Sequence, residues 1–388
     1  MLNSPFDALS GMPGPFARRR RPQPFDPASL FASGEQGAWY DPSDLRTLFQ
    51  DDAGTTPVTE PGQTVGLMLD KRLGLVRGDE ILDAEGVGAR ADWDGTSVGG
   101  TIDISGDELV VSNPSSSQWT ALIGFGTLKA NKSYEIIVTL SFVESGSFNV
   151  QTVNEAQDAV TSLGVNNVQA EVGAFRFIAP NLSDDGYFRI RHNASSTYTI
   201  SNVSIRELPG NHATQPTAES RPVYQAGGGL HWLEFDGVDD FLETADFGIH
   251  AEPTTYVAAT KITDEGSNAY VVDRAIGEDR QFIRWRDTGG TSPGYQLRGF
   301  NFRESEQNPA ILSLICDGGN SIFSANSIEK DFSNATSVFS KFYIGARFSQ
   351  QEYLSGNVYT LTAINRRLSS DELQKLRNLA ALRSGVTL

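Results

Sequence analysis

Apolar and polar residues alternate in short segments along most of the chain after residue 100. Three clear examples are "TIDISGDELVVSN" at 101–113, "SYEIIVTLSFVES" at 133–145 and "YTISNVSIREL" at 198–208. A period of two places alternate side chains on opposite faces of a β-strand, and Gly, Asn, Ser and Asp between the segments favour turns. The pattern therefore predicts an antiparallel sandwich, and the number of strands fits a jelly roll.

A second series of strand-like segments follows, including "TYVAATKI", "QFIRWR", "YQLRGF", "SLICDG" and "GNVYTLTAINRRL". It predicts a second all-β sandwich, in which Cys316 lies in a buried strand as a packed thiol. The pattern changes only at the end, in "SSDELQKLRNLAALR" at 369–383. There Ser369 and Glu372 form a capping box, and leucines repeat at helical spacing, so we expect one short C-terminal helix.

The first 35 residues have a different composition. Six prolines between Pro5 and Pro27 exclude regular helix or sheet over the whole stretch and predict an extended arm. Spaced aromatic residues and one basic run in this arm predict contact with another surface: Phe6, Phe16, Phe25, Arg18, Arg19, Arg20 and Arg21. The alternative is a disordered tail without a partner.

Length and charge narrow the classes of function. A chain of 388 residues exceeds one ordinary domain, which favours two. With 31 Lys and Arg against 48 Asp and Glu, the net charge of −17 argues against a general nucleic-acid or anionic-membrane binder. The N-terminus has no apolar signal-peptide core, and we find no run of the ~20 apolar residues that a membrane helix needs. We therefore expect synthesis in a cytoplasm and no membrane insertion.

Residues 235–244, "FDGVDDFLET", concentrate carboxylates between two phenylalanines. Asp236, Asp239 and Asp240 offer the hard oxygen ligands that Ca²⁺ prefers, so a calcium site is one interpretation. Turn chemistry is another, because Asp-Gly favours a hairpin in which Phe235 and Phe241 fix two strands to the core. The four histidines are scattered and predict no metal site.

Two segments resemble a known class of proteins. "GEQGAWYDPSDLRTLFQDDAGTTPVTEPGQTVGLMLDK" at 34–71 is similar to a segment of tailed-bacteriophage virion proteins. In those proteins the segment runs directly into a sequence like "GNHATQPTAESRPVY", found here at 210–224, and then into a concanavalin A-like, laminin-G-type lectin sandwich. "LEFDGVDDFLE", "FYIGARF" and "LSGNVYTLTAINRRLSSDEL" match the start, a late strand and the end of that sandwich in the right order.

The resemblance implies that one domain is inserted into another. Residues 1–35 are the arm, and residues 36–72 plus 209–388 form the split lectin-like domain, which we call the host sandwich. Residues 73–208, which we call the insert, are similar to carbohydrate-binding-module jelly rolls through "LKANKSYEIIVTLS" and "YTISNVSIREL". An insertion of this kind is tolerated because the two ends of a compact β domain often lie close together.

The same resemblance bears on catalysis. Glucanases of the concanavalin A-like fold carry Glu-x-Asp-x-Glu or Glu-x-Asp-x-x-Glu on one strand, which supplies a nucleophile and an acid/base. Here Glu234 and Asp236 are followed by Val238 and Asp239, so the second glutamate is missing. We predict no catalytic residues. A depolymerase would require Glu234 to face a carboxylate from another strand at ~5 Å.

The expected function is therefore a virion structural protein, in a tail fibre, tail tip or head fibre, that adheres to bacterial surface glycans. Sugar rings stack on exposed aromatic side chains, and the candidates are Trp119, Trp285 and Tyr295, each of which could instead belong to a core. Partners would be other virion proteins, bacterial polysaccharide and further copies of this chain, since virion proteins that dock through an arm usually form homo-oligomers. The alternative is a purely architectural capsid decoration or tail spacer.

Overall fold

The computed structural model describes most of the chain after residue 23. The described residues are 24–81, 93–96, 101–105, 108–113, 119–130, 132–154, 160–179, 182, 184–193, 195–248, 250–264, 268–274, 281–286, 294–297, 300–302, 309–333 and 338–388. Antiparallel sheets dominate them, and the one α-helix among them is the C-terminal α1 (Ser370–Ser384). The predicted all-β class with a short C-terminal helix is confirmed.

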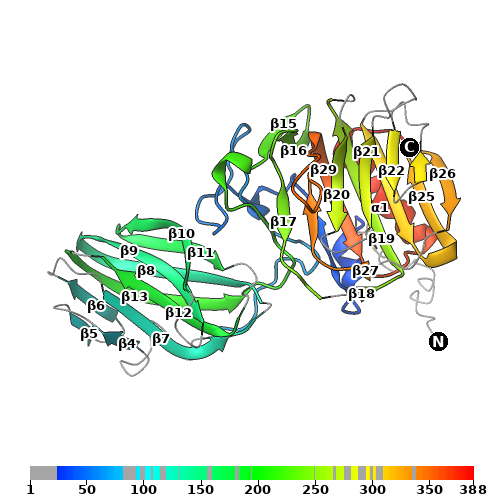
Figure 1. Ribbon diagram of the computed structural model, residues 1–388. Helices are drawn as coiled ribbons and strands as arrows, with labels where there is room; N and C mark the ends of the chain where they lie inside the picture. Colours follow the sequence, from blue (N-terminus) through cyan, green and yellow to red (C-terminus); the bar gives the residue numbers. More distant parts are fainter. Residues whose placement is uncertain are drawn as a thin grey trace, which may run out of the picture.

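The host sandwich has two large sheets (Figure 1). Sheet A contains, in spatial order, β15 (Val223–Gly227), β16 (Leu230–Asp236), β29 (Ser355–Ile364), β19 (Thr254–Ile262), β24 (Ala310–Cys316), β25 (Ser321–Ala325) and β26 (Ile328–Phe332), with β1 (Gly37–Tyr40) also paired to β29. Sheet B contains β2 (Leu48–Phe49), β3 (Leu67–Met68), β14 (Ala213–Thr214), β17 (Leu242–Thr244), β28 (Phe342–Ile344), β20 (Ala269–Arg274), β21 (Phe282–Arg286), β22 (Gly294–Leu297) and β23 (Phe300–Phe302). A short pair, β18 (His250–Ala251) and β27 (Val338–Phe339), lies outside both sheets.

The insert has two sheets of five strands each. Sheet C contains β11 (Gly173–Ala179), β8 (Tyr134–Ser145), β13 (Ser196–Glu207), β6 (Glu108–Asn113) and β5 (Thr101–Ser105). Sheet D contains β10 (Val160–Gln169), β9 (Ser147–Asn154), β12 (Gly186–His192), β7 (Trp119–Leu128) and β4 (Trp93–Thr96). β1 and β3, which precede the insert in the chain, pair with β29 and β14, which follow it, as a split domain requires, and β2 pairs with β3.

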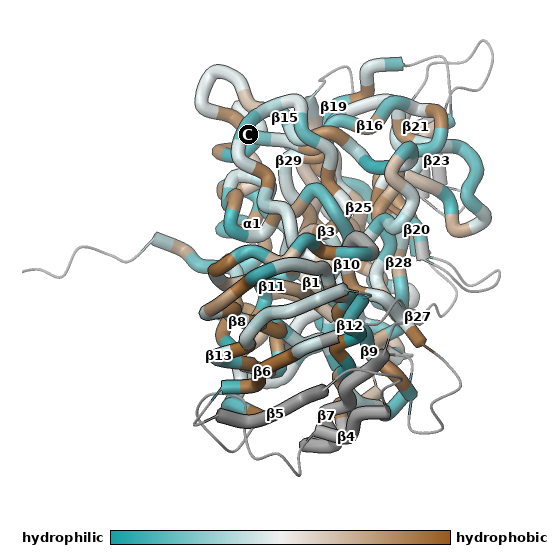
Figure 2. Tube along the Cα trace, turned by 90° about the vertical axis from the view of Figure 1, so that its left-hand side faces the viewer, coloured by the Kyte–Doolittle hydropathy of each residue, from teal (hydrophilic) through white to brown (hydrophobic). Residues whose placement is uncertain are grey.

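Each sandwich has its own hydrophobic core. In the insert, alternate residues of β8 and β12 point inward, among them Ile136, Val138, Phe188 and Ile190. Figure 2 shows the resulting alternation of hydrophobic and hydrophilic residues along strands of the insert. The host core is larger and lies between sheets A and B, where Tyr256 is one of its buried residues.

The outer face of sheet A is also covered. Helix α1 packs on it, so both faces of β24 are covered and every residue of this strand is buried, with Cys316 in the core between sheets A and B. The helix begins at the predicted capping box of Ser369 and Glu372 and ends at Gly385, whose φ is +71°. No helix in the described part of the chain is long and apolar enough to cross a membrane. The remaining short elements are the 3-10 helices η1 (Pro27–Phe31), η2 (Leu45–Thr47), η4 (Ala218–Ser220) and η5 (Gly318–Asn320).

The end of the predicted arm packs on the host sandwich itself, which corrects one expectation. η1 buries Leu30 and Phe31 against the outer face of sheet A, and Phe25 is half-buried beside them. Arg366 holds this segment by donating to the Leu30 carbonyl and pairing with Glu35. Residues 24–35 are thus part of the host sandwich, and Phe25 is a packing residue rather than a free docking group. The other predicted docking residues lie outside the described residues: Phe6, Phe16, Arg18, Arg19, Arg20 and Arg21.

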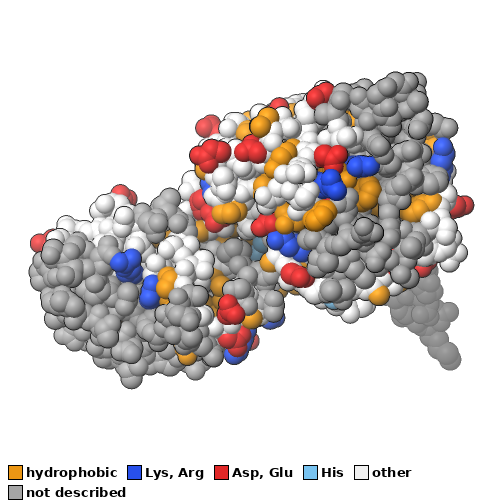
Figure 3. Space-filling model, in the orientation of Figure 1, with side chains coloured by type: hydrophobic (Ala, Val, Ile, Leu, Met, Phe, Trp, Pro, Cys, Tyr) orange, Lys and Arg blue, Asp and Glu red, His pale blue; other side chains and the backbone are white. Residues whose placement is uncertain are grey.

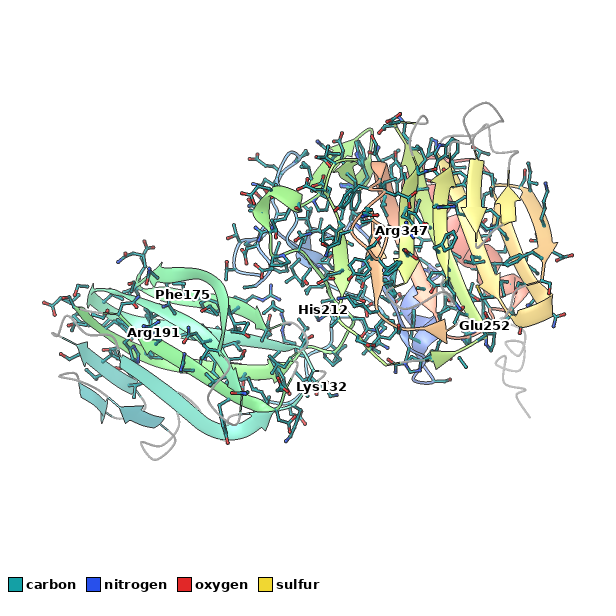
Figure 4. All side chains as sticks on the ribbon, in the orientation of Figure 1. Lys132, Phe175, Arg191, His212, Glu252 and Arg347 are labelled. Carbon is teal, nitrogen blue, oxygen red and sulfur yellow. The ribbon has the colours of Figure 1, made fainter. Side chains whose placement is uncertain are left out.

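Both chain connections to the insert meet at one buried carboxylate. Asp70 accepts hydrogen bonds from the backbone N–H groups of Trp39, Arg72 and Asn211 and from Arg72 Nε, at 2.8–2.9 Å. The Asp70 N–H donates to His212 Nδ1 at 3.0 Å, and burial lowers the pKa of His212 to about 4. Figure 4 labels His212 near this connection. The outgoing and returning chain are therefore held together where they leave the host sandwich.

The insert also touches the host sandwich through side chains. Ile178 and Leu208 pack with Phe49, Leu67 and Leu69 in a small apolar cluster. The Ile178 N–H donates to the Ala53 carbonyl, and the Arg176 guanidinium lies 4.8 Å from the centre of the Phe49 ring. This junction is built from residues more than 100 positions apart in the sequence, so only the tertiary fold brings it together.

Candidate functional site

The three aspartates of the predicted metal site do lie together. One carboxylate oxygen from each of Asp236, Asp239 and Asp240 falls within 4.8 Å of the others. They occupy the turn that follows β16, where Gly237 has a φ of +80° and a Cβ would stand 2.8 Å from the Ser355 Cβ. A glycine is therefore required there, and it brings the three carboxylates to one side of the turn.

Hydrogen bonds within the turn orient these carboxylates. Asp236 Oδ1 accepts from the backbone N–H groups of Val238 and Asp239, and Asp240 Oδ2 accepts from the Asp236 N–H at 3.0 Å. Ser220 donates its hydroxyl to Asp239 Oδ2 at 2.8 Å. The second oxygen of each aspartate has no hydrogen-bond partner among the described residues. Three carboxylate oxygens thus remain for a cation.

The electrostatics of the turn also favour a cation. Asp240 is only 4% exposed. Burial raises its pKa to about 7, and the charges of Asp236, Asp239 and Glu234 add to that effect. A divalent cation would compensate this concentration of negative charge, and all-oxygen ligands are what Ca²⁺ prefers. The residues fit a Ca²⁺ ion, which stays a prediction.

The hairpin interpretation of this stretch is wrong, although the turn is present. Phe235 in β16 and Phe241 just before β17 are both buried, as predicted. However, β16 pairs with β15 and β29 in sheet A, whereas β17 pairs with β14 and β28 in sheet B. The turn therefore crosses from one sheet to the other, and each phenylalanine is fixed in a different contact cluster.

Glu234 and Asp236 share the exposed face of β16, opposite the buried Leu233 and Phe235. Glu234 Oε2 accepts a hydrogen bond from Gln225 Nε2 on the neighbouring β15 at 2.9 Å. The carboxylate cluster found among the described residues contains Asp236 but not Glu234. The geometry around Glu234 thus shows a cross-strand amide contact.

Two of the predicted sugar-stacking residues belong to the host core. Trp285 is 3% exposed and Tyr295 is 1% exposed, and their rings meet edge to face at 5.1 Å. They are paired across β21 and β22 with both rings turned toward sheet A. Neither ring presents a face to solvent, so these two predictions are corrected. Trp119 begins β7, but its side chain lies outside the described part of the structure.

A polar surface on sheet D of the insert was not predicted. On β12 the buried Phe188, Ile190 and His192 alternate with Tyr187, Arg189 and Arg191, which project from the opposite face. Cross-strand pairing places Arg189 beside Gln151 and Arg191 beside Asn149. We call the group Tyr187, Arg189, Arg191, Asn149, Gln151 and Ser162 the polar face. Figure 4 labels Arg191 on the insert, away from the host sandwich.

Hydrogen bonds run across the polar face from strand to strand. Arg189 donates through Nε and Nη2 to Gln151 Oε1 at 2.8 and 2.6 Å, and Gln151 Nε2 donates to Ser162 Oγ at 3.0 Å. Gln151 is buried beneath these contacts at 4% exposure, and Asn149 accepts from the Asn167 N–H. The face therefore presents guanidinium groups that buried amides hold in place, and these groups suit the acidic groups of glycans.

A cleft of about 620 Å³ lies between the insert and the host sandwich. Lys132 and Glu207 line its insert side and pair with each other at 2.7 Å, while Arg72, Asn211 and Phe247 line its host side. Figure 4 labels Lys132 at this place. The opposite charges facing the cleft largely compensate each other, so its electrostatics select no class of ligand.

Comparisons with known proteins assign no family. No protein family and no curated protein matches the chain. One solved structure with weak similarity is the Trypanosoma rangeli sialidase in complex with the inhibitor DANA, at 12% identity and a TM-score of 0.24, covering 73% of this chain and 63% of the sialidase chain. Another is the Lactobacillus farciminis oxalate decarboxylase formate complex, at 9% identity and a TM-score of 0.12, covering 80% and 97%. At these TM-scores neither similarity bears on fold or function.

Proposed function

We propose that this protein is a structural component of a tailed-phage virion that attaches the particle to bacterial surface glycans. The resemblance of residues 34–71 and 210–224 to virion proteins supports the assignment to a virion. The observation that carries the binding role is the polar face of the insert, where side chains from β9, β10 and β12 are hydrogen-bonded in a row on the outside of a sheet.

In this proposal the two sandwiches have separate tasks. The insert makes the glycan contact, and the host sandwich connects it to the particle. Residues before position 24, with Phe6, Phe16 and Arg18 to Arg21, remain the proposed contact with other virion proteins. Single glycan sites of this type bind weakly, and many copies on one particle would multiply their effect through avidity. The place on the particle would be a tail fibre, a tail tip or a head fibre.

The turn at Asp236 would hold Ca²⁺ in the host sandwich. When bound there, the ion would compensate the charge of three carboxylates and fix the crossing between sheets A and B. Glycan binding is assigned to the insert, so calcium removal should lower the stability of the host sandwich more than it lowers the affinity for glycan.

Binding of the fluorescently labelled full chain to bacterial cells and to their purified surface polysaccharides tests the proposal. Saturable binding to cells that free polysaccharide competes away is the expected result. A chain that binds phage particles but none of the cells or polysaccharides, including those of the true host, would contradict adhesion and establish the architectural alternative of a capsid decoration or tail spacer.

A further inference from the structure

The polar face carries two guanidinium groups on one strand. Arg189 and Arg191 are separated by one residue on β12, so both project from the same side of sheet D, and both are half-buried. Figure 3 shows Lys and Arg side chains on the described surface of the insert. Two cations side by side repel each other, and burial, together with the charge of Arg191, lowers the pKa of Arg189.

The described contacts of Arg189 include no carboxylate. Its hydrogen bonds go to Gln151 Oε1, a neutral acceptor, and its Nη1 has no partner among the described residues. Other arginines of the insert differ in this respect. Arg176 pairs with Glu135 and Arg206 pairs with Glu80. Arg189 is therefore a positioned guanidinium with donor capacity to spare.

Gln151 fixes the orientation of the Arg189 guanidinium group. It accepts two N–H groups from Arg189 and donates to Ser162, and its burial leaves little room for another orientation. The same face continues into an apolar row, where Tyr187 pairs with Val153 and Val153 pairs with the exposed Val160. A sugar ring has an apolar face as well as polar edges, so a basic row next to an apolar row matches a charged sugar.

We propose that the polar face binds an acidic polysaccharide, whose carboxylate or phosphate groups are held by Arg189 and Arg191. This inference rests on the proposed adhesion function and names its ligand class. A guanidinium presents a planar fork of donors that matches carboxylate and phosphate geometry. The net charge of −17 on the whole chain makes the local pair selective, because an acidic polymer is attracted at this face and repelled elsewhere.

The test measures binding of the full chain to three immobilised polymers at physiological ionic strength. A polyuronate supplies carboxylates, a polyglycerol phosphate supplies phosphates, and dextran is the neutral control. The variants are Arg189→Gln and Arg191→Gln. Arg206→Gln is the matched control, because it removes the same charge from sheet C of the insert. Circular dichroism and thermal unfolding verify that each variant is folded.

The expected result is binding to at least one acidic polymer and not to dextran. Each of Arg189→Gln and Arg191→Gln should lower that affinity about tenfold or more, as loss of a charged hydrogen bond does, while Arg206→Gln leaves it unchanged. Preference for the uronate or for the phosphate polymer identifies which acidic group is recognised.

Gln151→Glu provides a second readout that does not remove either arginine. The new carboxylate would pair with Arg189 and compete with the ligand, so affinity should fall while stability is kept or raised. Equal binding of dextran and acidic polymers, or affinities unaffected by Arg189→Gln, Arg191→Gln and Gln151→Glu, would overturn the inference and leave adhesion standing. Failure to bind any polymer, together with failure to bind host cells, would overturn both.

Discussion

At the scale of single residues, Asp240 is the most perturbed carboxylate of the predicted metal site. It is buried while Asp236 and Asp239 beside it keep contact with solvent. The sequence brings these three residues within five positions, which is why their proximity was predictable. Their different burial was not, because it depends on the packing of the turn against residues such as Ser220 and Ser355.

The raised pKa of Asp240 predicts a pH dependence of stability. With a native pKa of about 7 and an unfolded pKa of about 3.9, the native state retains a proton that the unfolded state loses between those values. The free energy of unfolding from this group therefore falls as pH rises from about 4 to about 7 and is flat above. The shift corresponds to about 4 kcal/mol, which solvent screening by the exposed neighbours reduces to about 2 kcal/mol.

Urea unfolding of the wild type and of Asp240→Asn at several pH values measures this contribution. The difference between the two proteins isolates Asp240 from His192 and His212, whose lowered pKa values make stability rise with pH at the acidic end. The wild type should lose stability relative to the variant between pH 4 and pH 7. A difference independent of pH would contradict the assignment.

Calcium provides an independent test of the same turn. In the wild type at pH 8, millimolar Ca²⁺ should raise Tm by several degrees, because an ion that binds only the native state stabilises it. Asp240→Asn should lose most of this increase, whereas Asp371→Asn, on the exposed side of α1, should keep it. Equal increases in all three proteins would indicate nonspecific ion binding and exclude the site.

At the scale of elements, α1 shows which features of a helix a local sequence pattern predicts correctly. The capping box forms as predicted, and Arg366 lowers the pKa of Glu372 to about 2 through a hydrogen-bonded ion pair. The leucine repeat, however, is not a uniform core stripe. Leu376 is 2% exposed and Leu382 is 70% exposed, because the buried side of the helix runs along Leu376, Ala380 and Ser384, whereas Leu382 lies on the solvent side.

This difference predicts unequal costs for the same substitution. Leu376→Ala should lower the free energy of unfolding by about 2–5 kcal/mol, since it leaves a cavity between α1 and sheet A. Leu382→Ala on the same helix should change it by less than about 0.5 kcal/mol. Chemical denaturation of both variants checks the pair, and similar effects would mean that α1 does not pack as described.

At the scale of the whole molecule, the two sandwiches are joined at few places. The connections converge at Asp70, and the side-chain contact is the cluster around Ile178 and Phe49. Each core is built from its own strands, with Ala53 of the host sandwich as a contact residue of the insert core. The host sandwich therefore contains the strands that it needs without the insert.

Excision of the insert tests this independence. Joining Arg72 to Pro209 through a short glycine linker is feasible because Arg72 and Asn211 both hydrogen-bond to Asp70. The shortened chain should keep a β-type circular dichroism spectrum and unfold in one cooperative transition. Loss of cooperativity would show that the host sandwich depends on the insert, and the split-domain interpretation would then be wrong.

The sequence by itself determined the kinds of element present. Period-two alternation identified most strands of the insert, including β5, β6, β8 and β13, because a strand with one buried face alternates apolar and polar residues along its own sequence. It missed β4, β7 and β10, where glycine and polar residues interrupt the alternation. The terminal helix was predictable since its cap is a contact between residues three positions apart.

Only the tertiary structure decided which strands meet and which faces are covered. Pairing of β16 in sheet A and β17 in sheet B turned an expected hairpin into a crossing between sheets. Trp285 and Tyr295 are buried in the interior of the host sandwich, and the segment around Phe25 packs on sheet A. Arg189, Gln151 and Ser162 became one hydrogen-bonded row across three strands. Alternation reveals that a strand has two faces, but the partner strands and the sheet packing determine which face is buried and what lies beside each side chain.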